Sequence, residues 1–94
     1  MGQAVSITEV VAAYFREQGL EQTMLEDKLV GLWAEVMGPQ VARLTETPEI
    51  KDGVLYVRVR SAALRQQLFE CRSRLVQKLN DAAGGKIIKD IRLQ

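Results

Sequence analysis

Apolar residues recur at intervals of three and four through the first part of the chain, which predicts two amphipathic helices. We expect the first over residues 7–18, where Ser6 begins the pattern of an N-terminal capping box and a glycine marks the end. We expect the second over residues 22–37, with Trp33 buried at the edge of its apolar stripe and its indole N–H bonded to a carbonyl. Residues 39–43, which begin with proline, have the length of one further helical turn.

A strict alternation of apolar and polar residues over 54–60 predicts a strand with one buried face and one solvated face. Asp52 and Gly53 precede it, and this turn pair predicts a hairpin with another strand over residues 46–51. A last strand is expected over residues 86–93. Its alternation places Ile87, Ile91 and Leu93 on the core face and Ile88, Asp90 and Arg92 on the other face.

A run of leucines at helical spacing predicts a third long helix over residues 62–82, capped by Ser61. Cys71 lies within its apolar stripe, where we expect a small buried residue rather than a reactive thiol. The order α-α-β-β-α-β predicts one α+β domain over residues 1–94, with helices on one face of a three-stranded sheet. In this arrangement the other face of the sheet is left uncovered.

Composition argues against several classes of function. The 94 residues include no histidine and one cysteine, so the commonest general base and an internal disulfide are both missing. The sequence also contains no glycine-rich phosphate loop and no apolar run of membrane-spanning length. We therefore expect a cytoplasmic, non-enzymatic protein with no metal, cofactor, small-molecule substrate or membrane partner.

The net charge of +1 hides an asymmetry between the two halves of the chain. Residues 1–50 carry three basic and eight acidic side chains, whereas residues 51–94 carry ten basic and four acidic ones. Such a split indicates either a polyanionic partner for the basic half or attraction between the halves within the fold. Charge alone favours neither interpretation.

The uncovered sheet face is the sharper candidate for a binding site. Tyr56, Arg58 and Arg60 alternate with core residues, so their side chains project from one face about 6.5–7 Å apart. Guanidinium groups in such a row suit the phosphates of an extended single strand, and a tyrosine ring offers a base a stacking surface. The alternative is that these residues merely suit a solvated strand. The expected nucleic-acid-binding residues are Tyr56, Arg58, Arg60, Arg92, Lys86 and Lys89. Arg65 and Arg72 on the long helix could extend this basic area.

A second candidate surface lies on the long helix, where Arg65, Phe69, Arg72 and Val76 form a stripe beside the core stripe. Arginine interleaved with an aromatic residue is typical of protein interfaces, and this chain would then be a protein-binding adaptor or a small homodimer without a nucleic-acid role. The alternative, which we favour, is that Phe69 and Val76 are core residues and the arginines extend to solvent.

Several short motifs, in order and at similar spacing, resemble the bacterial DciA-like family over residues from about 20 to 94. The motifs are WAEVMG with Trp33 and Gly38, LTETP with Thr45 and Pro48, DGVLYVRVRS, ALRQQL with Leu64 and Leu68, LVQKLN with Asn80, and IIKDIRL. Each motif alone is unspecific, and their combined order carries the resemblance.

The resemblance implies a fold similar to the K-homology (KH) domain and a role in DNA replication. Family members assist loading of the replicative helicase DnaB and bind single-stranded DNA. Two departures bear on this expectation. The chain has no long basic extension beside the domain, and Gly84-Gly85 is not the Gly-x-x-Gly loop with which KH domains clamp a nucleic-acid backbone. We therefore expect weak DNA binding, with KH-like RNA binding as a further alternative.

Overall fold

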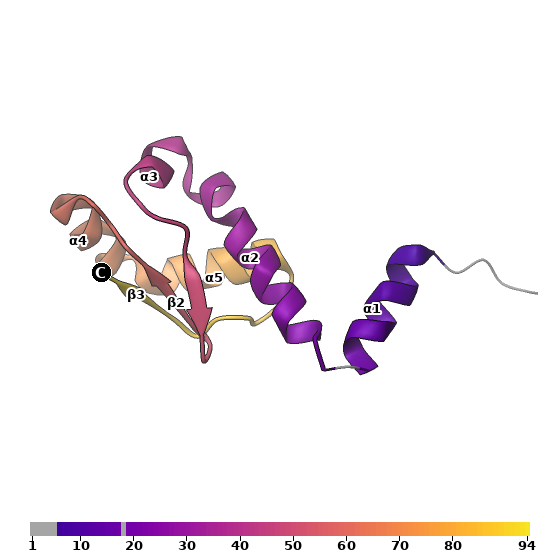
Figure 1. The fold of residues 1–94 in the computed structure, drawn as a ribbon. Coiled ribbons are helices and arrows are strands. Elements are labelled where there is room, and N and C mark those ends of the chain that lie inside the picture. Colours follow the sequence, from indigo (N-terminus) through magenta and orange to yellow (C-terminus); the bar gives the residue numbers. More distant parts are fainter. Residues whose placement is uncertain (1–5, 18) are drawn as a thin grey trace, which may run out of the picture.

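A computed structural model describes residues 6–17 and 19–94. Its elements are α1 (Ile7–Glu17), α2 (Glu21–Met37), α3 (Pro39–Arg43), β1 (Glu49–Lys51), β2 (Val54–Val57), α4 (Ala62–Glu70), α5 (Arg72–Ala83) and β3 (Asp90–Leu93) (Figure 1). The chain is therefore an α+β protein, as the sequence predicts. The helical turn expected over residues 39–43 is present as α3, and the long helix expected over residues 62–82 is two helices.

The three strands form one mixed sheet in the order β1-β2-β3. β1 and β2 are antiparallel and joined at Asp52 and Gly53, whose φ angles of 53° and 77° are the positive pair that a tight type I′ hairpin turn requires. β3 lies parallel to β2 on its other edge, so that α4 and α5 form the crossover between them. The predicted hairpin is confirmed.

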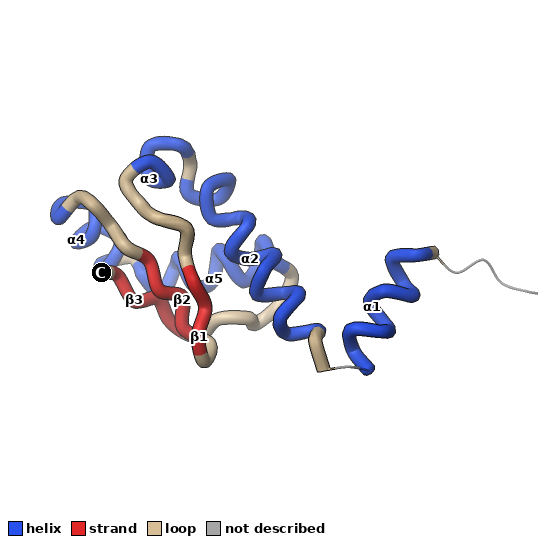
Figure 2. The backbone as a smooth tube through the Cα atoms, viewed as in Figure 1, coloured by secondary structure: helices blue, strands red, loops and turns tan. Residues whose placement is uncertain are grey.

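One face of the sheet packs against helices, chiefly α2 and α5, with α4 against β3 (Figures 1 and 2). The buried cluster between these layers includes Leu29 and Trp33 of α2, Leu55 and Val57 of β2, Leu75 and Leu79 of α5, and Ile91 of β3. Each of these side chains is at most 7% exposed, which is the burial expected for the interior of a small domain. The predicted core face of β2 is confirmed.

Trp33 is buried as expected, but its hydrogen-bond acceptor is a hydroxyl rather than a carbonyl. The indole N–H donates to Thr45 Oγ1 at 2.9 Å, and that hydroxyl donates to the carbonyl of Val41 at 3.1 Å. Thr45 is itself 7% exposed, so the pair forms a buried relay from α2 to the end of α3. Each buried polar group in the relay therefore has a partner, as burial demands.

β3 begins at Asp90, four residues later than expected, because the preceding backbone bonds to a side chain instead of a strand. Asn80 of α5 accepts hydrogen bonds from the N–H groups of Ile87 and Ile88, both at 3.0 Å, and donates to the carbonyl of Ile88 at 2.8 Å. Ile87 and Ile88 are both 4% exposed. The prediction that Ile88 faces solvent is therefore wrong, since strand alternation does not apply before Asp90.

The hairpin strands are also shorter than the expected ranges of 46–51 and 54–60. Pro48 has no N–H to donate, and the regular ladder stops beside it. Beyond it an isolated antiparallel bridge joins Thr45 and Val59, so the inward and outward alternation of side chains continues past the end of β2.

The expected helix over residues 62–82 is interrupted at Cys71, where φ and ψ of −110° and 20° leave the helical region. No glycine or proline marks this position. Both segments pack against β3, and α5 also lies along α2, so the second segment has a neighbour that the first lacks. Cys71 is consequently half-buried at the junction instead of fully buried. Ser61 caps α4 as predicted, accepting from the Leu64 N–H at 3.2 Å.

α1 extends away from the body and meets it through α2 (Figure 2). Its cap is as predicted, since the Glu9 N–H donates to Ser6 Oγ at 3.1 Å. Its apolar stripe does not enter the core. Ile7 and Val10 are 81% and 54% exposed. The spacing of apolar residues therefore predicts the helix correctly, but these apolar side chains are not buried.

Candidate nucleic-acid interface

The uncovered face of the sheet carries the predicted tyrosine and arginines in adjacent positions. Tyr56 of β2 pairs with Arg92 of β3 on one side and with Glu49 of β1 on the other. Arg58 follows on the same face. The Glu46 N–H donates to the carbonyl of Arg58, and the Val59 N–H donates to the carbonyl of Gln94, so Glu46 and Gln94 lie on either side of this segment. Tyr56 is half-buried, while Arg58 and Arg92 are exposed. The structure therefore brings these three residues together.

Acidic residues lie on this face as well, although a count of charges by halves of the chain does not show it. Three cross-strand rows hold the outward-facing residues Lys51, Val54 and Asp90, then Glu49, Tyr56 and Arg92, then Glu46, Arg58 and Gln94. Each row thus contains an acid: Asp90 of β3 in the first, Glu49 of β1 in the second, and Glu46, three residues before β1, in the third. The face therefore offers arginines to a polyanionic partner and also pairs residues of the acidic half with residues of the basic half. It is not a uniformly basic patch.

A shallow hollow of about 420 Å³ lies on this face and is lined by Glu46, Thr47, Glu49, Lys51, Tyr56, Arg58 and Gln94. Tyr56 contributes the aromatic surface in it. A base resting there would contact the ring while its phosphates lie near guanidinium groups.

Arg60 is exposed but turns toward α3, where its Nη1 donates to the carbonyl of Arg43 at 3.2 Å. It lines a second hollow of about 400 Å³, which we call the arginine notch, together with Glu46, Arg58, Val59, Arg65 and Gln94. Arg65, predicted to lie on the protein-binding stripe, therefore belongs beside Arg58 and Arg60. The signal in the sequence is that α4 begins directly after this strand segment, which places its first turns at the end of β2.

Lys86 and Lys89 lie elsewhere. They line a groove of about 680 Å³ between α5 and the hairpin turn, together with Asp52 and Asp81 among others. The N–H of Lys89 donates to the carbonyl of Gly53 at 2.7 Å, which fixes this segment to the start of β2. Since Arg58 and Arg60 follow the other end of β2, the two lysines do not extend the same basic area.

The stripe expected over Arg65, Phe69, Arg72 and Val76 is divided by the break at Cys71. Phe69 is 50% exposed, so the expectation that it is a core residue is wrong. The Arg72 guanidinium lies 4.2 Å from the centre of its ring and donates to the Phe69 carbonyl at 3.1 Å. Val76 is half-buried and packs on the core as expected.

Comparison with known proteins adds the family. The family model described as "Dna[CI] antecedent, DciA" matches residues 6–93. The chain belongs to the DciA family. The match includes α1, which lies before the motifs on which the sequence resemblance rests.

Relatives within curated proteins are similar over most of this chain. A UPF0232 protein of Rhodococcus jostii (strain RHA1) is 27% identical over 88 residues, covering 94% of this chain and 45% of that protein. UPF0232 proteins of Mycobacterium tuberculosis (strain H37Rv) and Mycolicibacterium paratuberculosis are 27% and 28% identical over 78 residues, covering 83% of this chain and 42% and 43% of theirs. The chain thus spans less than half the length of these relatives.

The residues that carry the resemblance to the DciA family are mainly structural. Trp33 and Thr45 form the buried relay, and Asn80 bonds to residues 87–88. Among the motifs of the resemblance, these positions stabilise the fold, whereas DGVLYVRVRS supplies Tyr56, Arg58 and Arg60 of the candidate interface. Over residues 6–17 and 19–94, no group of three or more His, Cys, Asp or Glu side chains is arranged to hold a metal ion. Within the same ranges, no helix is long and apolar enough to cross a membrane.

Proposed function

We propose that this DciA-family chain is a non-enzymatic accessory factor of the replicative helicase that binds single-stranded DNA weakly. The observation that carries the DNA-binding part is the position of Tyr56, half-buried on an uncovered sheet face with Arg92 beside it and Arg58 next along the strand. An aromatic ring among guanidinium groups matches the two needs of single-strand binding, which are stacking and phosphate neutralisation.

The acidic residues of the same face argue for weak binding. Glu46 and Glu49 lie beside Arg58 and Tyr56 in the cross-strand rows, and carboxylates repel phosphates at close range. Stacking on Tyr56 is sequence-tolerant because every base has a π-face. The proposal is therefore a low-affinity contact without base preference, in which the helicase supplies the remaining affinity.

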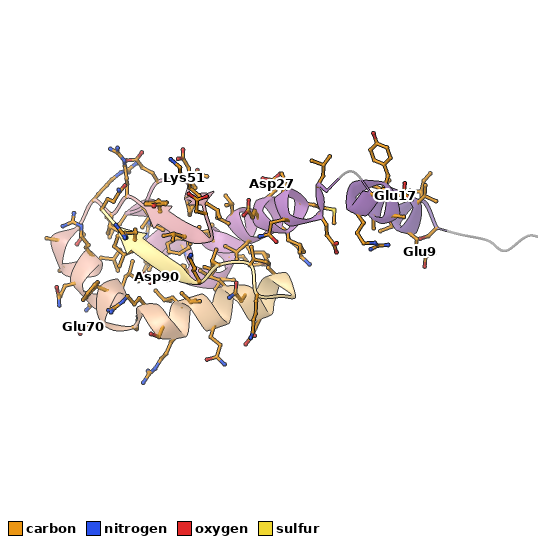
Figure 3. The ribbon with its side chains drawn as sticks, turned by 90° about the horizontal axis from the view of Figure 1, so that it is seen from below. Glu9, Glu17, Asp27, Lys51, Glu70 and Asp90 are labelled. Carbon is orange, nitrogen blue, oxygen red and sulfur yellow. The ribbon has the colours of Figure 1, made fainter. Side chains whose placement is uncertain are left out.

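The helicase part of the proposal rests on family membership. A helper without an ATPase site acts by binding one conformation of its partner better than another. A tenfold shift in that equilibrium needs about 1.4 kcal/mol of preference, which a small interface provides. Figure 3 shows Glu9 and Glu17 on α1 and Asp27 on α2, on the side of the molecule away from Glu70. Lys51 and Asp90, also labelled there, belong to β1 and β3 of the sheet. The end with Glu9, Glu17 and Asp27 is the surface we assign to the helicase.

Fluorescence anisotropy of a labelled single-stranded oligonucleotide tests the DNA contact. Removing the two arginines of the face with Arg58→Ala/Arg92→Ala should lower the affinity at least tenfold. The matched control Arg74→Ala/Lys78→Ala removes the same charge from exposed positions on α5 and should lower it less than threefold. Equal losses in the two double variants would contradict a site on the sheet. Tighter binding of an RNA oligonucleotide of the same sequence would favour the KH-like RNA alternative.

Helicase loading onto a closed single-stranded circle tests the second part. We expect more helicase on the circle when this protein is added, together with a complex detected by sedimentation. Equal loading and no complex would contradict the helicase proposal and leave only DNA binding.

A second candidate function is supported by Phe69, whose ring is half exposed beneath Arg72. Such a pair fits a purely protein-binding adaptor. Mapping of chemical shifts with an oligonucleotide separates the two, because shifts on the sheet favour DNA binding and none at low salt favours the adaptor.

A further inference from the structure

Three guanidinium groups from two different elements converge in the arginine notch. Arg58 and Arg60 come from the segment that follows β2, and Arg65 comes from the second turn of α4. Glu46 is the one carboxylate side chain among the lining residues, so the lining side chains have three positive charges and one negative charge. The positive excess that the sheet face lacks is therefore concentrated here.

Two of the three guanidinium groups are held in place by carbonyls rather than by carboxylates. Arg65 Nη2 donates to the Val59 carbonyl at 2.9 Å, and Arg60 Nη1 donates to the Arg43 carbonyl at 3.2 Å. A neutral acceptor orients a guanidinium group without cancelling its charge. These arginines are consequently positioned before any ligand arrives, which lowers the entropy that binding must cost.

Arg65 also has a donor without a partner, since its Nε is buried and makes no hydrogen bond. A buried N–H that is left unbonded costs free energy, and such a group calls for an explanation in a native fold. The carbonyl of Val59 accepts from one nitrogen of the Arg65 guanidinium group. The group has further N–H donors, and the protein supplies too few acceptors for them. An oxyanion in the notch can accept from terminal N–H groups of the same guanidinium, whose charge and orientation Nε shares, while Nε itself is closed to solvent.

The notch is continuous with the hollow over Tyr56, because Glu46, Arg58 and Gln94 line both. Four residues of extended chain separate Tyr56 from Arg60, which corresponds to about 13 Å. A single strand with one base on Tyr56 therefore reaches the notch with a neighbouring phosphate.

We propose that the arginine notch is a phosphate-binding site, and that its ligand is a phosphodiester of a single strand lying across the sheet face. The phosphate chemistry follows from the three arginines, whereas the single-strand source rests on the proposed function. The notch fixes the position of the backbone, and Tyr56 receives a base without selecting it.

Arginine side-chain NMR tests the site in the intact chain. In the ¹H–¹⁵N spectrum the buried Nε–H of Arg65 should shift on addition of millimolar inorganic phosphate at constant ionic strength, and at lower concentration with a single-stranded oligonucleotide. Chloride at the same ionic strength should leave it unchanged. The Arg74 resonance on α5 is the internal control and should move little in each titration.

Binding of the oligonucleotide to variants gives the second measurement. Arg65→Gln should weaken it about tenfold, Arg65→Lys at least threefold because the fork is lost while the charge remains, and Arg74→Gln less than twofold. Circular dichroism and urea unfolding of each variant confirm that it is folded, and Arg60→Gln provides an independent variant in which the Val59 contact is intact.

The outcomes separate this inference from the proposed function. If wild-type protein binds DNA but the Arg65 signal does not move and Arg65→Gln equals Arg74→Gln, the notch is overturned and the proposed function stands. If phosphate shifts Arg65 but no single strand binds, the notch is a site for free phosphate and the DNA proposal fails. Shifts by both ligands, with selective loss in Arg65→Gln and Arg60→Gln, support the inference as stated.

Discussion

Three side chains with polar groups inside the fold hold its irregular segments to its helices. Trp33 and Thr45 connect α2 to the end of α3, and Asn80 connects α5 to the segment before β3. These bonds satisfy buried donors and acceptors. The free energy lost when one is removed comes mainly from the group that is left unpaired, and less from the hydrogen bond itself. At this scale single substitutions with isosteric controls are informative.

Thr45→Val keeps the shape of the side chain and removes the hydroxyl that accepts from the Trp33 indole N–H. We expect the free energy of unfolding to fall by about 1–3 kcal/mol because the buried N–H loses its partner. Urea denaturation measures it, with Thr45→Ser as the control that retains the hydroxyl. An equal loss in both variants would assign the effect to packing instead.

Asn80→Ala removes the acceptor of two backbone N–H groups and the donor to one carbonyl. We expect it to lower the free energy of unfolding by about 2–4 kcal/mol, since several half-buried groups are left unpaired together. Gln77→Ala, at an exposed position on the same helix, should change it by less than about 0.5 kcal/mol. If the two variants were equally stable, the role of Asn80 in fixing this segment would be refuted.

At the scale of elements, local patterns predict what is locally determined. The alternation around Tyr56 and the Asp52–Gly53 turn give the hairpin and its exposed face, and the leucine spacing gives α4 and α5. The break at Cys71 has no local marker, since no glycine or proline occurs there. Arg65 and Phe69 stay four residues apart on α4, and the contact of Arg65 with the Val59 carbonyl is a tertiary feature that helical spacing does not contain.

Burial and charge also depend on tertiary contacts that the sequence pattern does not contain. β3 starts late because the side chain of Asn80, seven and eight residues earlier, takes the hydrogen bonds of the backbone that precedes the strand. Glu46 and Glu49 belong to the acidic half of the chain, and only the pairing of β1 with β2 brings them beside Tyr56 and Arg58. The exposed face of β2 is therefore predictable, whereas its charge balance is not.

α1 offers a prediction at this scale, because its apolar positions are exposed. Val10→Glu should change the free energy of unfolding by less than about 0.5 kcal/mol, as is usual for surface substitutions. Leu29→Ala, in the buried part of α2, should lower it by about 2–5 kcal/mol. Chemical denaturation of both variants compares them, and a loss above 2 kcal/mol in Val10→Glu would mean that α1 packs on the body.

At the scale of the whole molecule, charge is separated along an elongated shape. The principal extents are 61, 25 and 19 Å, and α1 lies at the end of the molecule away from the sheet (Figure 1). The arginine notch is lined by residues that follow β2 and by α4. The long extent of 61 Å exceeds the Debye length of about 8 Å at physiological ionic strength, so charges at the two ends of the molecule act independently on charged partners.

The number of phosphates neutralised by the sheet face and the notch is a property of this whole surface. With three or four contacts from the cations Arg58, Arg60, Arg65 and Arg92, the logarithm of the association constant for single-stranded DNA should fall with the logarithm of salt concentration with a slope of about −2 to −3, from about −0.7 per phosphate. Oligonucleotide titrations between low and physiological salt measure it. A slope near zero would show that binding, if present, does not involve phosphates.

The parallel pairing of β2 with β3 also orders the folding of the molecule in time. Glu49 pairs with Tyr56, seven positions away, whereas Val54 pairs with Asp90, 36 positions away. Closing the longer loop costs roughly 1.5 kcal/mol more chain entropy, and distant pairings of this kind slow folding. We therefore expect the hairpin to form before β3 joins it, so that in the interval one edge of β2 presents unpaired N–H and C=O groups to any neighbouring chain. We expect misassembly to compete with folding at this step, and Asn80 to shorten the interval because it holds residues 87–88 against α5.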